Sequence, residues 1–250
     1  MEDKLLIDNT VKKAKKTQER DIITYTNFLD PRELNLVIKE LIKQKYKYQI
    51  IRVNEEVEKC IIMFLPTYLK LEYIDMNEYI SCIKISIKKG QKLKHKDYMG
   101  AIYNMGVKRE YIGDIFVYED NSACIFCTPK IAEYFKYNLI NVGKYEVQVD
   151  IKKIEEIEMP KKLFEKFEII VPSNRLDNIV TEIIKISRNK AIEKIAAKEV
   201  FVNYEENTNK SLTLKEKDII SIRGTGKYKV DSFLGETKKG NQIISIKKYS

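Results

Sequence analysis

The first 77 residues combine helical and strand spacing of their apolar side chains. Residues 5–20 are predicted to form a helix. Asp30 precedes Pro31 and Glu33, which predicts a second helix start, because aspartate caps the first turn, proline suits the first helical position and glutamate completes a capping box. Apolar residues then recur at helical spacing: Leu34, Val37, Ile38, Leu41 and Ile42. With strands expected at residues 46–53 and 60–65, residues 1–77 are predicted to form a small α+β domain.

Residues 78–151 have a more regular order. Ile83, Ile85 and Ile87 alternate with polar residues, as in a half-buried strand. Further along the chain we expect a helix over 96–105 that ends at Gly106, then strands at 114–118 and 123–127, a helix over 130–139 and a strand at 144–150. The order β-α-β-β-α-β predicts a ferredoxin-like plait. RNA-binding plaits stack bases on a K/R-G-F/Y-G/A-F-V-x-F/Y strand, and residues 113–118 lack that pattern. We therefore expect a plait with a different surface, or none that binds bases.

Residues 152–172 are rich in Lys and Glu and contain Pro160 and Pro172, so we expect a linker, helical in part around 161–166. In residues 173–250, apolar residues line one helix face, and Ser187 can cap a second helix. Strand spacing follows at 200–203 and 218–223, and a last strand is expected at 242–246. The first helix face consists of Leu176, Ile179, Val180, Ile183 and Ile184.

The excess of positive charge indicates a polyanionic ligand such as RNA. The chain carries 46 Lys and Arg against 37 Asp and Glu, and residues 173–250 alone carry 16 against 10. Guanidinium groups suit bidentate phosphate contacts, and A-form RNA is read through shape and phosphates because its deep major groove hides the base edges. Asp177 is interpreted as structural, orienting a helix end or an arginine. One cationic surface can be offered by Arg175, Arg188, the stripe Lys190, Lys194 and Lys198, and the strand end at 223–227.

Residues 173–250 resemble the S4 RNA-binding domain, which implies RNA contacts on this surface. The resemblance rests on Arg175-Leu176-Asp177, Ser187-Arg188 with Ala191, residues 200–203 and residues 218–224. Lys198 and Lys217 stand where the S4 pattern commonly has glycine, so each needs a negative φ or a strained left-handed conformation. The residues predicted to contact RNA are Arg175, Ser187, Arg188, Lys190, Lys194, Lys198, Asn203, Arg223 and Lys227.

The whole chain resembles the YlmH family of bacterial S4-domain proteins. The matching blocks are residues 28–33, residues 93–101 with 106–109 and 112–115, and the S4-like part with 223–226 and 237–240. The resemblance implies a non-catalytic factor of ribosome-associated quality control, which helps to add C-terminal tails to stalled nascent chains. Its implied partners are ribosomal RNA of the large subunit, the P-site tRNA as a further candidate, and the tailing machinery. The family has also been linked to cell division.

We expect a cytoplasmic monomer without membrane contact. The segment Met1-Glu2-Asp3-Lys4 lacks the basic and apolar parts of a secretory signal, and no apolar run approaches the ~20 residues that span a bilayer.

The cysteines predict neither a metal nor a cofactor. Cys124 and Cys127 have the CxxC spacing of zinc and redox sites, but they lie in an expected buried strand, where positions three apart face opposite sides. Cys60 and Cys82 stand alone in apolar strands, so all four cysteines are interpreted as buried free thiols. The single histidine, His95, leaves few catalytic constellations.

Two other classes stay open as alternatives. An S4-bearing RNA-modifying enzyme would need chemistry in residues 1–172, where Asp97 and Asp114 are better explained as caps. A methyltransferase would need a glycine-rich loop between strand and helix, and the only G-x-G lies at 224–226. An adaptor linked to cell division could use the lysine cluster at 12–16 on anionic lipid, although the apolar face beside it is modest.

Overall fold

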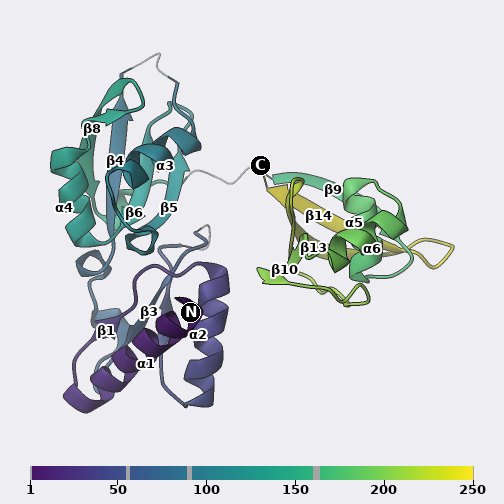
Figure 1. The fold of residues 1–250 in the computed structure, drawn as a ribbon, viewed down its shortest axis with the longest axis horizontal. Coiled ribbons are helices and arrows are strands. Elements are labelled where there is room, and N and C mark those ends of the chain that lie inside the picture. Colours follow the sequence, from purple (N-terminus) through teal and green to yellow (C-terminus); the bar gives the residue numbers. More distant parts are fainter. Residues whose placement is uncertain (1, 55–56, 89–91, 160–163, 250) are drawn as a thin grey trace. The chain divides into compact units, whose positions relative to one another are not determined.

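The computed structural model of the chain describes residues 2–54, 57–88, 92–159 and 164–249. It separates into two compact units, Met1–Pro160 and Lys161–Ser250, called here the N-terminal unit and the C-terminal unit. Both combine helices with antiparallel sheets (Figure 1), which confirms the predicted α+β class.

The N-terminal unit begins with α1 (Glu2–Arg20) and α2 (Pro31–Lys43), which pack on a three-stranded sheet of order β1-β3-β2. The predicted capping box is present: the backbone N–H of Glu33 donates to the Asp30 carboxylate, and that of Asp30 donates to Glu33, each at 2.8 Å. The strands are β1 (Thr24–Tyr25), which was not expected, and β2 (Gln49–Ile51) and β3 (Ile61–Phe64), which are shorter than expected.

The same unit continues into a five-stranded antiparallel sheet of order β5-β6-β4-β8-β7. Without the short edge strand β7, this is the order of the predicted plait. Helices α3 (His95–Asn104) and α4 (Pro129–Asn138) cover one face (Figure 1). The strands are β4 (Ser81–Ile87), β5 (Ile112–Val117), β6 (Ala123–Cys127), β7 (Asn141–Val142) and β8 (Tyr145–Lys152). Single-turn helices lie at Leu71–Tyr73, Met76–Glu78, Arg109–Tyr111 and Ile154–Glu156.

The second face of the plait sheet is largely covered by the N-terminal residues. Phe116 and Phe126 on this face share one buried core with Phe28 and Met63. The backbone N–H of Phe28 also donates to the Glu110 carbonyl at 2.9 Å. The domain boundary expected between residues 77 and 78 is therefore absent from the described residues, because one hydrophobic core contains side chains from both sides of it. This core forms because apolar side chains on both faces of the plait strands must leave water.

The cysteines are arranged differently from the expectation. Cys124 and Cys127 do face opposite cores, as strand alternation predicts. However, Cys82 forms a disulfide with Cys124, with their Cα atoms 6.6 Å apart, so only Cys60 and Cys127 are free and buried among the described residues. The pairing arises because β4 and β6 are antiparallel neighbours that place both side chains on one face. Burial raises the pKa of the Cys60 thiol to about 11.

The C-terminal unit is a six-stranded antiparallel sheet of order β11-β10-β12-β13-β14-β9, with α5 (Leu176–Ile184) and α6 (Arg188–Ala196) on one face (Figure 1). The predicted apolar face of α5 is buried against Val200, Ile220, Val230 and Ile244. The strands are β9 (Phe164–Val171), β10 (Val200–Val202), β11 (Glu205–Glu206), β12 (Ile219–Ile222), β13 (Gly226–Glu236) and β14 (Gln242–Tyr249).

The expected linker at 152–172 is wrong over its second half, because residues 164–171 form β9 and pair with β14. Of the helix expected around 161–166, residues 161–163 lie outside the described residues and residues 164–166 are strand. Ile169 and Val171 face the core, whereas charged residues alternate with them, and this alternation gives an edge strand the composition of a linker. Strand β13 was not expected either.

Candidate RNA interface

A buried carboxylate organises the junction between α5 and α6. Asp177 has no exposed side-chain area and accepts hydrogen bonds from two arginines. Arg175 donates through Nε and Nη2 at 3.0 Å each, and Arg188 donates through Nε at 3.1 Å and Nη2 at 2.8 Å. Side-chain exposures of 35% for Arg175 and 56% for Arg188 leave both guanidinium groups in contact with solvent. Asp177 therefore orients both arginines, as the sequence analysis predicted for one.

The charge state of Asp177 suits this role. Burial by itself raises the pKa of the carboxyl, but the hydrogen bonds and positive charges of Arg175 and Arg188 outweigh it and hold the pKa below the ordinary value of 3.8. The carboxylate is thus ionised at neutral pH. A fixed anion that holds two cations leaves one net positive charge at a defined position.

The backbone around Arg175 is also fixed. Leu176 donates its N–H to the Leu212 carbonyl at 2.8 Å, and Asn174 donates its side-chain amide to the Leu214 carbonyl at 2.9 Å. Ser187 caps α6 as predicted and accepts the Lys190 N–H at 3.4 Å. These contacts set where α5 and α6 begin, and so where the two arginines emerge.

The other residues that were predicted to contact RNA lie in different environments. Lys190 and Arg223 are exposed. Lys194 donates to Glu199 at 2.6 Å, and Lys198 lies 3.3 Å from Glu206, so each lysine has an acidic neighbour. Asn203 donates its amide to Asp218 and accepts the Ile219 N–H, both at 2.9 Å, which builds the turn between strands.

Lys227 does not share the surface of the two arginines. Its neighbour Tyr228 is buried in the core beneath α5 and α6, so strand alternation places Lys227 on the other face of the sheet. Its Nζ lies 4.6 Å from the Tyr204 ring centroid and 4.9 Å from that of Tyr249. The expectation of one cationic surface ending at Lys227 was wrong. Lys227 lies in β13, and strand alternation turns its side chain to the sheet face away from α5 and α6.

The two lysines at glycine positions take the left-handed conformation. Lys198 has φ 58° and Lys217 has φ 73°. Lys217 donates its N–H to the Val230 carbonyl at 2.7 Å, which holds its turn in place. The chain therefore keeps the turn geometry and accepts the strain of a side chain there.

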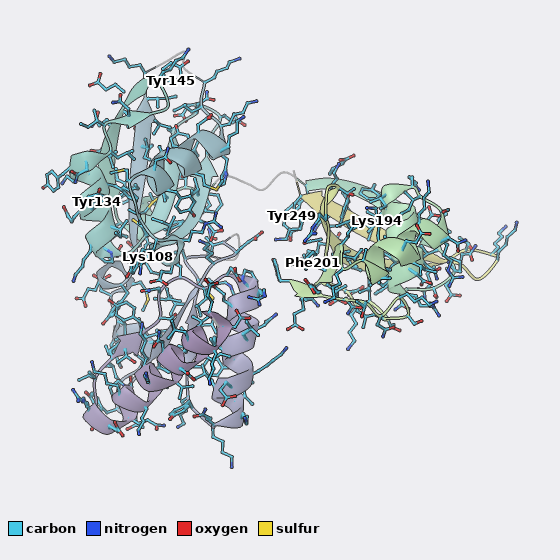
Figure 2. The ribbon with its side chains drawn as sticks, viewed as in Figure 1. Lys108, Tyr134, Tyr145, Lys194, Phe201 and Tyr249 are labelled. Carbon is cyan, nitrogen blue, oxygen red and sulfur yellow. A yellow bond between two sulfur atoms is a disulfide. The ribbon has the colours of Figure 1, made fainter. Side chains whose placement is uncertain are left out.

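The plait carries basic and aromatic side chains that the sequence analysis did not single out. The Arg109 guanidinium lies 5.4 Å from the Tyr103 ring centroid, and the Tyr134 hydroxyl donates to the Met105 carbonyl at 3.4 Å. Lys108 and Tyr134 are labelled in Figure 2. The available signal was the alternation of Lys, Arg and Tyr through residues 103–111 and 130–137.

The face that RNA-binding plaits use for stacking is largely closed here. Phe116 and Phe126 are 9% and 1% exposed. The open end of this face holds a hollow of about 490 Å³, lined by Lys84, Tyr118 and Lys152 and by the acidic residues Asp120, Glu156 and Glu158. Any nucleic acid on the plait must therefore use this end, the helix side or the loops.

Comparisons with known proteins found the following similarities. A family model described as "Putative RNA-binding domain in YlmH" matches residues 75–156, which hold the plait. The chain is 23% identical over 247 residues to the ribosome-associated protein quality control protein P2 of Bacillus subtilis (strain 168), covering 99% of this chain and 95% of that protein. A solved structure of the cell division protein ylmH from Streptococcus pneumoniae is 22% identical with a TM-score of 0.49, over 63% of this chain and 96% of that chain.

The fold and the matched segment define an α+β protein with an RNA-binding domain. The matched segment and the full-length similarity to the Bacillus subtilis protein relate the chain to the YlmH family. The sequence predicted RNA contacts in residues 173–250 alone, whereas the family model places its putative RNA-binding domain over the plait. Among the described residues, no helix is both long and apolar enough to cross a membrane, and no cluster of His, Cys, Asp or Glu could hold a metal ion.

Proposed function

We propose that this chain is a non-catalytic RNA-binding factor that docks on the large ribosomal subunit through α5 and α6 of its C-terminal unit. The observation that carries the proposal is the pair of solvent-facing arginines held by one buried carboxylate. Fixing a guanidinium before binding removes much of the entropy that its side chain would otherwise lose on meeting a phosphate.

The hydrogen bonds leave donors for a ligand. Each guanidinium uses Nε and Nη2 on Asp177. Among the described residues, the Nη1 group of neither Arg175 nor Arg188 has a hydrogen-bond partner. These groups can donate to phosphate oxygens, and Lys190 adds a further cation on α6. A rigid cationic surface of this kind favours a structured RNA, which is recognised mainly by backbone and shape.

The finer role is supported by the relative in Bacillus subtilis, whose name places that protein in ribosome-associated quality control. We propose that this chain acts there too, beside the machinery that tails stalled nascent chains. In this arrangement the C-terminal unit, as an S4-like module, contacts ribosomal RNA close to the P-site tRNA. The plait supplies a further RNA contact, in keeping with the family description. The protein acts in the cytoplasm as a monomer.

Co-sedimentation with purified large ribosomal subunits tests this proposal. The full chain is expected to travel with the subunits, whereas Arg188→Ala stays near the top of the gradient. Lys239→Ala is the matched control, because Lys239 is an exposed lysine at the tip of the β13–β14 hairpin, on the same unit. In a titration, losing one phosphate contact should reduce the slope of log affinity against log salt by roughly 0.7–0.9. Equal sedimentation and equal slopes for all three proteins would refute the assignment.

A further inference from the structure

The face of the C-terminal sheet opposite α5 and α6 carries aromatic rings and lysines in a continuous arrangement. The Phe164 and Tyr249 rings lie 5.1 Å apart at an interplanar angle of 76°. Lys227 lies between Tyr249 and Tyr204, 4.9 Å and 4.6 Å from their ring centroids. Lys247 lies 5.8 Å from the centroid of Phe164. Each contact joins neighbouring side chains, so they form one surface, called here the aromatic face.

Strand alternation places these residues on the side away from the helices. Tyr228, Ile244 and Ile246 point into the core beneath α5 and α6. Their sequence neighbours Lys227 and Lys247 therefore point the other way. Phe201 belongs to the same face, because it pairs with Ser221, which pairs with Lys227. Figure 2 shows Phe201 and Tyr249 at one end of the C-terminal unit and Lys194 of α6 nearer its centre.

The charges of this face favour an anionic occupant. Lys166, Lys227, Lys229 and Lys247 lie on it by alternation. Asp231 lies 3.1 Å from Lys166 and 2.7 Å from Lys247, so this carboxylate orders both lysines and offsets part of their charge. Even with Glu168 and Glu206 added, the latter opposite Phe201, the four lysines outnumber the three acidic residues on this face.

Aromatic rings among lysines match the chemistry of unpaired nucleotides. Bases stack on tyrosine and phenylalanine whatever their sequence, and nearby ammonium groups meet the phosphates that join them. A second protein is less well matched, because the cores of protein interfaces are depleted in lysine. The rings here are half-buried, so part of each remains open to stacking.

We propose that the aromatic face is a second RNA-binding surface, which holds an unpaired stretch of RNA by stacking bases on Phe201, Tyr204 and Tyr249 and by contacting phosphates through Lys227 and Lys247. The proposal deepens the proposed function and takes only its ligand class, RNA, from it. The helix side would read a structured element, and the aromatic face would hold a single strand that continues from it or belongs to another RNA.

The test measures binding of a fluorescent oligouridine RNA of about 12 nucleotides, within the range of single-strand site sizes, to the full chain. Tyr249→Ala is expected to weaken binding roughly tenfold, whereas Tyr249→Phe keeps the ring and should bind like the original protein. Lys227→Gln should weaken binding and reduce the salt slope by roughly 0.7. Circular dichroism melting of each variant shows whether the C-terminal unit remains folded.

Arg188→Ala distinguishes the two surfaces. If it lowers binding to large subunits but not to oligouridine, while Tyr249→Ala does the reverse, the aromatic face is a separate site.

Oligouridine binding that fails only in Arg188→Ala would overturn the proposal by assigning single strands to the helix side. Absence of oligouridine binding, or equal affinity for all folded variants, would also overturn it. So would a Tyr249-dependent dimer in sedimentation equilibrium with no oligouridine effect, since the face would then be a protein interface. Intact oligouridine binding without ribosome binding would count against the proposed function alone.

Discussion

Replacing Asp177 by asparagine separates an orienting role from simple charge. Asparagine has nearly the same shape, but it removes the anion that accepts four hydrogen bonds from Arg175 and Arg188. A hydrogen bond to a charged group contributes about 1.5–3 kcal/mol, and breaking a buried pair costs most when the remaining charge stays buried. Both arginines here reach solvent, so screening reduces the effect and we expect a loss of about 2 kcal/mol. For a unit of this size, that corresponds to roughly 8–16 °C in melting temperature.

The effect of pH has a definite sign. The folded-state pKa of Asp177 is depressed below 3.8, so its stabilisation is fully present above the unfolded value and is lost as pH falls through the folded one. The difference between the original protein and Asp177→Asn should therefore be constant near neutral pH and shrink below pH about 4. Urea unfolding at several pH values measures it.

RNA binding gives the decisive result for Asp177→Asn. By charge alone, removing an anion from a cationic surface should strengthen RNA binding. The orienting role predicts the opposite, because the two guanidinium groups lose their fixed positions and must be ordered on binding. We expect large-subunit affinity to fall several-fold in the folded variant, measured at one fixed salt concentration. Unchanged or tighter binding would refute the reasoning.

Three further predictions concern stability and are checked by thermal melting. Asp30→Ala removes one half of the capping box of α2 and should cost about 1 kcal/mol; an unchanged melting temperature would contradict this role. Gly113→Ala should cost about 1–3 kcal/mol, since its Cβ would lie 2.9 Å from Cβ of Phe126, whereas Gly100→Ala meets nothing within 4 Å and is the control. Lys198→Gly should stabilise by up to about 1 kcal/mol, because it relieves a left-handed lysine at φ 58°; destabilisation would show that the lysine side chain matters more than its backbone strain.

Local patterns account for much of what could be predicted. The capping box at Asp30, the apolar face of α5 and the Ser187 cap each depend on residues within one or two helical turns. The plait order was also readable, because alternating spacing and helical spacing follow each other in distinct segments. These features are local, so the surrounding fold changes them little.

Other features depend on contacts between distant segments. Strand β9 has the charged Lys166 and Glu168 in the middle of its outward face, and only its pairing with β14 makes it a strand rather than a linker. The side of the sheet that Lys227 occupies follows from the register of β12 and β13, which pattern alone left undefined. The Cys82–Cys124 pair likewise needed the neighbouring positions of β4 and β6.

For the candidate interface, the sequence by itself determined which cations are present and that Arg175, Asp177 and Arg188 flank the starts of two helices. Only the tertiary structure brought the two arginines onto one carboxylate and divided the remaining cations between two faces. The physical reason is that a charge pattern fixes composition and spacing along one element, whereas hydrogen-bond geometry and strand register join elements that are far apart in the chain.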